Sequence, residues 1–187
     1  MIGVRAALKL LPMVFLRSQE FRQGRWEEID WTSSMWRIPA TRMKGTLADK
    51  RKEAPHLVPL STQAVVILKE LHAHTGPSGF MFPGQRSCQR PMSDAAINAA
   101  LQAMGYDTKN EVTGHGFRST ARTLGEQVLK CNPRVLELQL AHATDEELGN
   151  AYDRADFLQE RVEFMQQWAD LLDRLKNPPA QLVRRAA

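Results

Sequence analysis

The chain has 187 residues, which is enough for one well-buried domain and too few for two domains of ordinary size. Hydrophobic residues make up 43% and charged residues 25%, a balance typical of a globular protein, and no apolar run reaches the roughly 18 residues that a membrane span needs. The net charge of +4 is compatible with a nucleic acid partner but does not by itself identify one.

The N-terminus and the cysteines both indicate an intracellular protein. Arg5 and Lys9 interrupt the first apolar run, which therefore does not resemble a secretory signal. Cys88 and Cys131 lack a CxxC spacing, so we expect two free thiols in a reducing compartment and no zinc site. We predict a cytoplasmic protein with no membrane partner and no metal.

An amphipathic helix opens the chain. Val4, Ala7, Leu8 and Leu11 follow the i, i+3, i+4, i+7 spacing of a helix with one face on a core. No clear capping residue precedes them, so we expect that further residues stood before Met1 in a parent protein.

After Gly24 the pattern changes to short segments rich in Trp, Ile and Val, which predict a small antiparallel sheet. The three predicted strands are Arg25–Trp31, Met35–Pro39 and His56–Leu60. The connection between the last two strands is too polar to be buried. Its basic residues are Lys44, Lys50, Arg51 and Lys52.

Beyond the sheet, the spacing predicts helices almost to the end of the chain. Ser61 suits the N-cap of the first, and Gly76 followed by Pro77 supplies its stop. Ser93 is predicted to begin the second helix, and Pro133 suits the first turn of the fourth. The side chains expected to face the core are Ala64, Ile67, Leu68, Leu71, Ile97, Ala100, Leu101, Met104, Phe117, Thr120, Ala121, Leu124, Leu158, Val162, Met165, Ala169 and Leu172.

These elements predict an α+β fold that is mainly α-helical and has a small three-stranded antiparallel sheet. We expect one domain over residues 1–175. Residues 176–187 contain two prolines and the pair Arg184 and Arg185, and we expect them to form a flexible C-terminal tail.

Three local patterns contain side chains suited to phosphate binding and proton transfer. They are Arg17 with Glu20, His115 with Arg118 as H-x-x-R, and His142 ten residues before Tyr152. A lysine-bearing hairpin lies between the first pattern and the second. In this order they resemble the tyrosine recombinase (phage integrase) family, whose signature is an arginine, a hairpin lysine, H-x-x-R, a His or Trp, and a nucleophilic tyrosine.

The resemblance extends from about Val4 to Leu175 and implies the catalytic fold of the DNA breaking-rejoining enzymes. The segments most similar to prophage and genomic-island integrases are Trp26–Asp30, Arg42–Lys44, His56–Leu60, Gly114–Arg118 and Ala151–Arg154. The implied activity is site-specific integration or excision on double-stranded attachment-site DNA by four subunits, without a cofactor. The family usually carries N-terminal DNA-binding domains, and we expect this chain to lack them.

Each implied catalytic residue suits transfer of a phosphodiester. Arg17 and Arg118 would clamp the non-bridging oxygens, to which His142 would also donate a hydrogen bond. Tyr152 would attack phosphorus and form a 3′-phosphotyrosine. The remaining roles are proton exchange with that tyrosine by His115 and protonation of the departing 5′ oxygen by Lys44.

Several alternatives stay open on the sequence. Lys50 and Lys52 compete with Lys44 because the hairpin connection is long, and Tyr106 competes with Tyr152 as nucleophile. Glu20 lies three residues after Arg17 and is expected to orient the site rather than transfer protons. The rival functions are a type IB topoisomerase, which shares this chemistry, and a non-catalytic DNA-binding remnant of a prophage integrase.

Overall fold

The computed structural model describes residues 2–44, 54–142 and 157–177. The helices in these ranges are α1 (Ile2–Val14), α2 (Ser18–Arg22), α4 (Thr62–Thr75), α5 (Ala96–Ala103), α6 (Gly116–Gln127), α7 (Pro133–Gln139) and α9 (Leu158–Lys176), with 3₁₀ turns η1 (Trp26–Glu28) and η2 (Ala40–Arg42). The strands are β1 (Ile29–Asp30), β2 (Met35–Ile38) and β3 (His56–Pro59). The predicted mainly helical α+β fold is thus confirmed. No helix within these ranges is long and apolar enough to cross a membrane.

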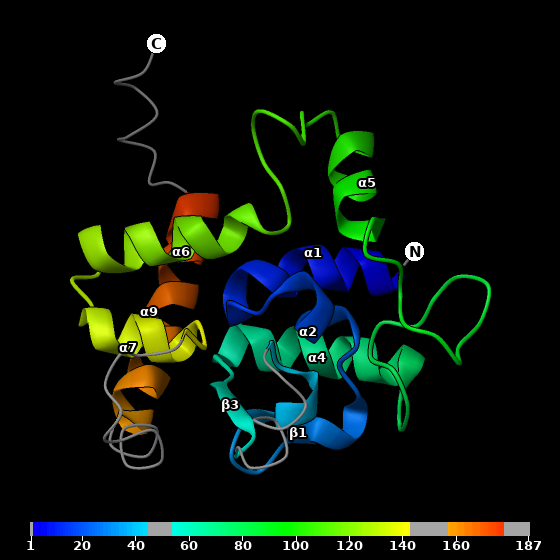
Figure 1. The fold of residues 1–187 in the computed structure, drawn as a ribbon, viewed down its shortest axis with the longest axis horizontal. Coiled ribbons are helices and arrows are strands. Elements are labelled where there is room, and N and C mark those ends of the chain that lie inside the picture. Colours follow the sequence, from blue (N-terminus) through cyan, green and yellow to red (C-terminus); the bar gives the residue numbers. More distant parts are fainter. Residues whose placement is uncertain (1, 45–53, 143–156, 178–187) are drawn as a thin grey trace.

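Helix α1 lies at the centre of the fold, with α4 below it and α5 and α6 above it in Figure 1. Its sequence confirms the predicted amphipathic pattern, because Ala7 and Leu11 are buried while Val4 and Leu8 pack against the core from its edge. One hydrophobic cluster joins α1 to the sheet, α4 and α5. A second cluster joins α6, α7 and α9, and it includes Phe15 from the corner after α1. Helix α1 and its C-terminal corner therefore connect the two halves of the core.

The sheet has the order β1-β2-β3, and both pairs of neighbouring strands are antiparallel. Trp36 on the central strand lies opposite Ile29 on one side and Val58 on the other. The predicted first strand, Arg25–Trp31, is largely wrong, because its first half forms η1 and only Ile29–Asp30 pairs with β2. The Glu28 carboxylate accepts a hydrogen bond from the backbone N–H of Arg25 at 3.2 Å, which favours a turn over extended backbone.

Helix α4 begins and ends where the sequence predicts. The Ser61 hydroxyl accepts a hydrogen bond from the N–H of Ala64 at 3.2 Å, and the helix ends at Thr75 before Gly76. The second predicted helix starts later than expected, at Ala96 rather than next to Ser93. Residues 76–95 contain no helix, since prolines at 77, 83 and 91 remove backbone donors that a helix needs.

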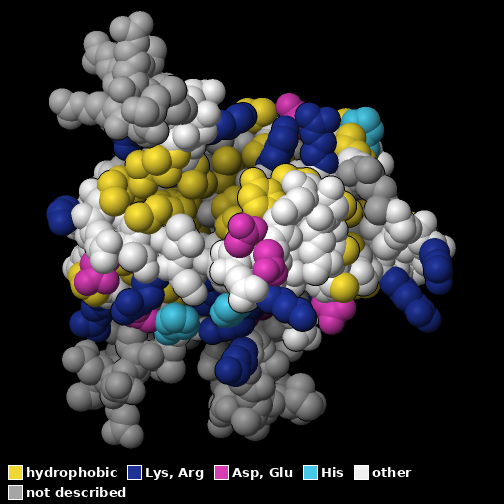
Figure 2. All heavy atoms as spheres, turned by 90° about the horizontal axis from the view of Figure 1, so that it is seen from above, with side chains coloured by type: hydrophobic (Ala, Val, Ile, Leu, Met, Phe, Trp, Pro, Cys, Tyr) yellow, Lys and Arg dark blue, Asp and Glu magenta, His cyan; other side chains and the backbone are white. Residues whose placement is uncertain are grey.

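Three side chains predicted to face the core, Met104, Val162 and Thr120 on α6, are exposed instead. Met104 follows the last residue of α5 and is 61% exposed, and Val162 on α9 is 36% exposed. Figure 2 looks onto the side of α5 and α6 and shows hydrophobic side chains gathered on this face. A hollow here is lined by Leu8, Leu101, Met104, Tyr106, Glu111, Val112 and Phe117. Met104 therefore lines a surface hollow rather than the interior.

Close packing places α6 directly against α7 and α9. A Cβ at Gly125 of α6 would lie 2.9 Å from Leu136 Cδ2 and 3.0 Å from Phe164 Cζ, so the glycine permits this approach. Pro133 is the first residue of α7, as predicted, and the Asn132 side chain accepts a hydrogen bond from the N–H of Arg134 at 2.9 Å. These contacts fix α7 relative to α6, and both helices carry side chains of the candidate site.

At Gly24 the chain passes between Met81 and the fully buried Trp36. A Cβ at this position would overlap the Met81 methyl group and the Trp36 ring. We expect Gly24→Ala to lower the free energy of unfolding by about 1–3 kcal/mol, as overpacking of a core does. Urea denaturation followed by circular dichroism measures the change.

Gly3→Ala is the matched control for this substitution. Gly3 lies in α1 with nothing within 4 Å of its added Cβ, so alanine should leave stability unchanged or raise it by up to about 1 kcal/mol. Equal midpoints for Gly24→Ala and the unaltered chain would contradict the close packing at Gly24.

Candidate active site

The centre of the candidate site is the guanidinium of Arg118, which projects from the first turns of α6 and is 6% exposed. Its Nη1 donates a hydrogen bond to the carbonyl of Phe15, and its Nη2 donates to the carbonyl of Leu140 at 2.8 Å. Burial lowers the pKa of Arg118 to about 10, and the nearby charge of Arg17 acts in the same direction, while Glu20 and Glu137 oppose it. The side chain therefore stays positively charged at neutral pH.

The carbonyls around the two predicted arginines come from unusual backbone. Phe15 has φ of 60° and Ala141 has φ of 50°, a left-handed conformation that residues with a Cβ rarely adopt. The Phe15 carbonyl accepts a hydrogen bond from Arg118, and the Ala141 carbonyl accepts a hydrogen bond from Arg17 Nη2 at 3.4 Å. Both strained residues thus hold an arginine of the predicted site.

Arg17 and Glu20 are joined as the sequence predicts. The Glu20 carboxylate lies 2.8 Å from Arg17 Nη1, and it also accepts a hydrogen bond from the Arg17 backbone N–H at 3.0 Å, at the start of α2. Glu20 is 2% exposed. Because a buried carboxylate binds both the backbone and the side chain of Arg17, the orientation of this guanidinium is fixed before any ligand arrives.

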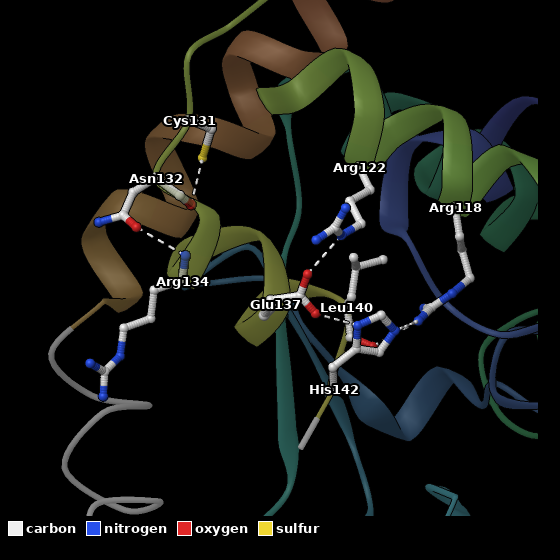
Figure 3. Close-up of polar contacts among 8 residues, drawn as sticks. All are labelled: Arg118, Arg122, Cys131, Asn132, Arg134, Glu137, Leu140 and His142. Atoms are coloured by element: carbon white, nitrogen blue, oxygen red, sulfur yellow. Dashed lines mark hydrogen bonds and ion pairs between the residues drawn. The ribbon is translucent and has the colours of Figure 1, made fainter. Parts of the chain in front are cut away.

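His142 follows α7, and its ring lies between Arg118 and Glu137 (Figure 3). Its Nε2 is 3.3 Å from Arg118 Nη2, and its Nδ1 contacts the Glu137 carboxylate. The same carboxylate is 2.7 Å from Nε of Arg122, which lies one turn after Arg118 on α6. Burial opposes ionisation of Glu137, but hydrogen bonds from Arg122 and His142 outweigh it and hold the pKa of this carboxyl below its ordinary value.

The sequence interpretation missed Arg122 and Glu137. Arg122 could have been identified from the sequence. Residues four apart on a helix share a face, and the H-x-x-R motif already placed Arg118 on a helix. Glu137 could not have been identified in this way, since its contact with His142 crosses the end of α7 and depends on how the chain turns there.

The remaining predicted residues are placed less completely. His115 is exposed and directly precedes α6, and its carbonyl accepts a hydrogen bond from the Arg118 N–H at 3.1 Å. Lys44 is exposed and lies two residues after η2. Tyr152, Lys50 and Lys52 lie outside the described residues.

Tyr106, the competing nucleophile, lies in a different environment from the arginines. It is 47% exposed and lines the hollow next to α5 with Met104 and Phe117. Among the predicted site residues that the structure describes, Arg17, Lys44, His115, Arg118 and His142 do not line this hollow. This position gives Tyr106 no part in the arrangement around Arg118.

Arg17, Arg118 and His142 together form a compact set of cationic and hydrogen-bonding groups. Two guanidiniums can bind two oxygens of one phosphate with fixed geometry, and an imidazole N–H can donate one further hydrogen bond to the same phosphate. Each of these side chains is held by a backbone carbonyl or a carboxylate, so little ordering remains to be done when an anion binds.

Comparison with known proteins identifies the family to which the chain is similar. The profile of the phage integrase family matches residues 2–159. The integrase of Enterobacteria phage P4 is 43% identical over 183 residues, which are 94% of this chain and 42% of that relative. Two Escherichia coli proteins also match: the putative protein IntB is 42% identical over 90% of this chain and 44% of its own length, and the prophage integrase IntZ is 37% identical over 92% and 40%.

The chain spans less than half the length of these relatives. No solved structure matches the chain. The family match covers most of the chain and contains Arg17, His115, Arg118 and His142. The chain therefore belongs to the phage integrase family, and its fold is that of the DNA breaking-rejoining enzymes.

Proposed function

We propose that this chain is the catalytic domain of a tyrosine recombinase, which cuts and rejoins double-stranded DNA during site-specific integration or excision. The observation that carries the proposal is the convergence of Arg17, Arg118 and His142, each held in place by other groups of the protein. Membership of the phage integrase family supports the same reaction. Residues 1–175 would form this domain.

In the proposed reaction, the scissile phosphate binds between the two guanidiniums. Negative charge grows on the non-bridging oxygens as a fifth bond forms at phosphorus, and Arg17 and Arg118 stabilise it from fixed positions. With both ring nitrogens protonated, His142 donates a third hydrogen bond from Nε2, while the Glu137 carboxylate accepts from Nδ1 and keeps the ring oriented. Because Arg118 is already desolvated, its charge acts strongly on the bound phosphate.

The bond changes balance without a cofactor. The Tyr152 oxygen forms a bond to phosphorus and loses its proton to His115. The bond between phosphorus and the 5′ oxygen breaks, and Lys44 gives that oxygen a proton to yield a 5′ hydroxyl. Reversal of these steps with another 5′ hydroxyl rejoins the strand. The phosphotyrosine ester retains the bond energy that rejoining needs.

The proposal extends to assembly and location. Recombination exchanges strands between two duplexes, so we infer that four copies act together on two attachment sites in the cytoplasm. A type IB topoisomerase would instead relax supercoiled DNA as a monomer and yield no recombinants. A binding remnant would form no covalent bond to DNA.

The first test removes the nucleophile. We expect Tyr152→Phe to bind duplex DNA as the unaltered chain does, because only one hydroxyl is lost, and to form no covalent adduct with a nicked suicide substrate carrying the attachment site. Denaturing gel electrophoresis detects the adduct. Tyr106→Phe is the control and should keep it. An adduct that survives in Tyr152→Phe and disappears in Tyr106→Phe would overturn the assignment.

The second test concerns the general acid. Lys44→Ala should slow cleavage by roughly 10²–10⁴-fold, the usual contribution of a positioned proton donor. A substrate with sulfur in place of the 5′ bridging oxygen has a leaving group that departs without a proton, so Lys44→Ala should recover most of its rate on it. Arg118→Ala should not recover, since it serves the non-bridging oxygens. Sulfur rescue of Lys50→Ala or Lys52→Ala, but not of Lys44→Ala, would reassign the acid.

The third test concerns the contact between Glu137 and His142. Glu137→Gln keeps the shape of the side chain but loses its charge, so we expect cleavage to slow by roughly 10- to 100-fold, as expected for one charge-assisted hydrogen bond. Glu126→Gln is the control, because Glu126 is an exposed carboxylate one turn after Arg122 on α6 and acts on Arg122 through its charge. Equal rates for the two variants would show that Glu137 does not act through His142.

A further inference from the structure

Arg42 lies two residues before Lys44 and forms a nearly buried ion pair with Glu28. This pair is not part of the site described above. The Arg42 guanidinium binds both oxygens of Glu28, at 2.5 and 2.6 Å. The two side chains are only 10% and 9% exposed. This bidentate geometry fixes the direction of a guanidinium as well as its position.

Further contacts attach this pair to the rigid part of the fold. Arg42 Nη1 also donates to the carbonyl of Gln23 at 2.9 Å. The indole N–H of Trp36 donates to Glu28 at 2.9 Å, and Trp36 is fully buried on the central strand. The Arg25 backbone N–H donates to the same carboxylate at 3.2 Å. Arg42 is thus bound to two segments that precede the sheet and, through Glu28, to the sheet itself.

The backbone between this ion pair and Lys44 is short and held on both sides. Arg42 is the last residue of η2, and its N–H donates to the Pro39 carbonyl at 2.9 Å, while the N–H of Met43 donates to the Ala40 carbonyl at 3.0 Å. Met43 follows in extended conformation with its side chain 7% exposed in the main core. Lys44 comes next and is exposed. The point where Lys44 leaves the core is therefore set by Arg42 and Met43.

We propose that Arg42 and Glu28 are positioning residues for Lys44, and that they determine where this lysine meets the 5′ leaving oxygen. This inference rests on the proposed function, in which Lys44 is the general acid. It also distinguishes Lys44 from Lys50 and Lys52, because only Lys44 directly follows the anchored segment.

A second ion pair of the same sheet provides the comparison. Arg37 Nη2 lies 3.0 Å from the Asp30 carboxylate, but these side chains are 50% and 29% exposed and the contact is not bidentate. Exposed pairs of this kind hold little in place, because water screens the charges and both side chains remain able to move. The pair Arg37 and Asp30 therefore serves as a matched control on strands β1 and β2.

The experiment uses the full 187-residue chain and the two suicide substrates, one with oxygen and one with sulfur at the 5′ bridging position. The double variant Glu28→Gln with Arg42→Gln leaves no unpaired buried charge. The side-chain oxygen of Gln at position 28 can still accept the hydrogen bond from the Trp36 indole N–H. We expect its cleavage of the oxygen substrate to fall roughly 10- to 100-fold, as for a misplaced catalytic group. Its rate on the sulfur substrate should stay within about threefold of the unaltered chain, because that leaving group needs no proton.

Control variants separate positioning from general damage. Asp30→Asn with Arg37→Gln should leave both rates unchanged. Arg42→Lys keeps the positive charge but loses the bidentate geometry of the guanidinium. We therefore expect a smaller loss of cleavage rate on the oxygen substrate, and a rate on the sulfur substrate that is again restored. This single variant carries the test if thermal unfolding shows that the double variant does not fold.

Equal slowing of Glu28→Gln with Arg42→Gln on both substrates, or no slowing on either, would overturn the positioning role. A second outcome would also overturn the positioning role: the sulfur substrate does not restore the cleavage rate of Lys44→Ala, while the unaltered chain still forms its covalent adduct with DNA. This outcome would leave the proposed function standing. Absence of an adduct between the unaltered chain and either substrate would instead overturn the proposed function, and this inference with it.

Discussion

The arrangement of the site depends on one buried cation, Arg118. Its guanidinium binds the Phe15 carbonyl at the corner after α1 and the Leu140 carbonyl at the end of α7. Three segments far apart in the sequence therefore meet at one side chain. Burial disfavours this charge, yet the pKa of Arg118 falls only to about 10, in part because Glu20 and Glu137 lie nearby. The protein thus keeps a desolvated positive charge at neutral pH.

Hydrophobic packing supports the backbone strain that this arrangement needs. A left-handed residue other than glycine costs on the order of 1–3 kcal/mol. Phe15 is held in that conformation by its side chain, which is 1% exposed and packs edge-on against Trp168 at 5.4 Å and Phe164 at 5.7 Å between ring centroids. Helix α9 therefore contributes to the site without supplying a residue to it, because it fixes the corner whose carbonyl binds Arg118.

The sequence was sufficient where an interaction is local. Arg17 and Glu20 are three residues apart at a helix start, so spacing alone placed their side chains together. It was insufficient where a contact joins distant segments or breaks a propensity. Nothing in the pattern indicates that Phe15 adopts a left-handed conformation, or that Glu28 turns a strand-like segment into η1 while it binds Arg42.

Under the proposed function, this chain forms a covalent bond to DNA through Tyr152. Cleavage after Lys and Arg would release residues 135–154 as one peptide that contains Tyr152 and no other tyrosine, while Tyr106 lies in a separate peptide. After reaction with a suicide substrate and nuclease digestion, mass spectrometry should find the peptide of residues 135–154 with a 3′-linked nucleotide on its tyrosine. A nucleotide on the peptide that contains Tyr106, or on neither peptide, would contradict the account.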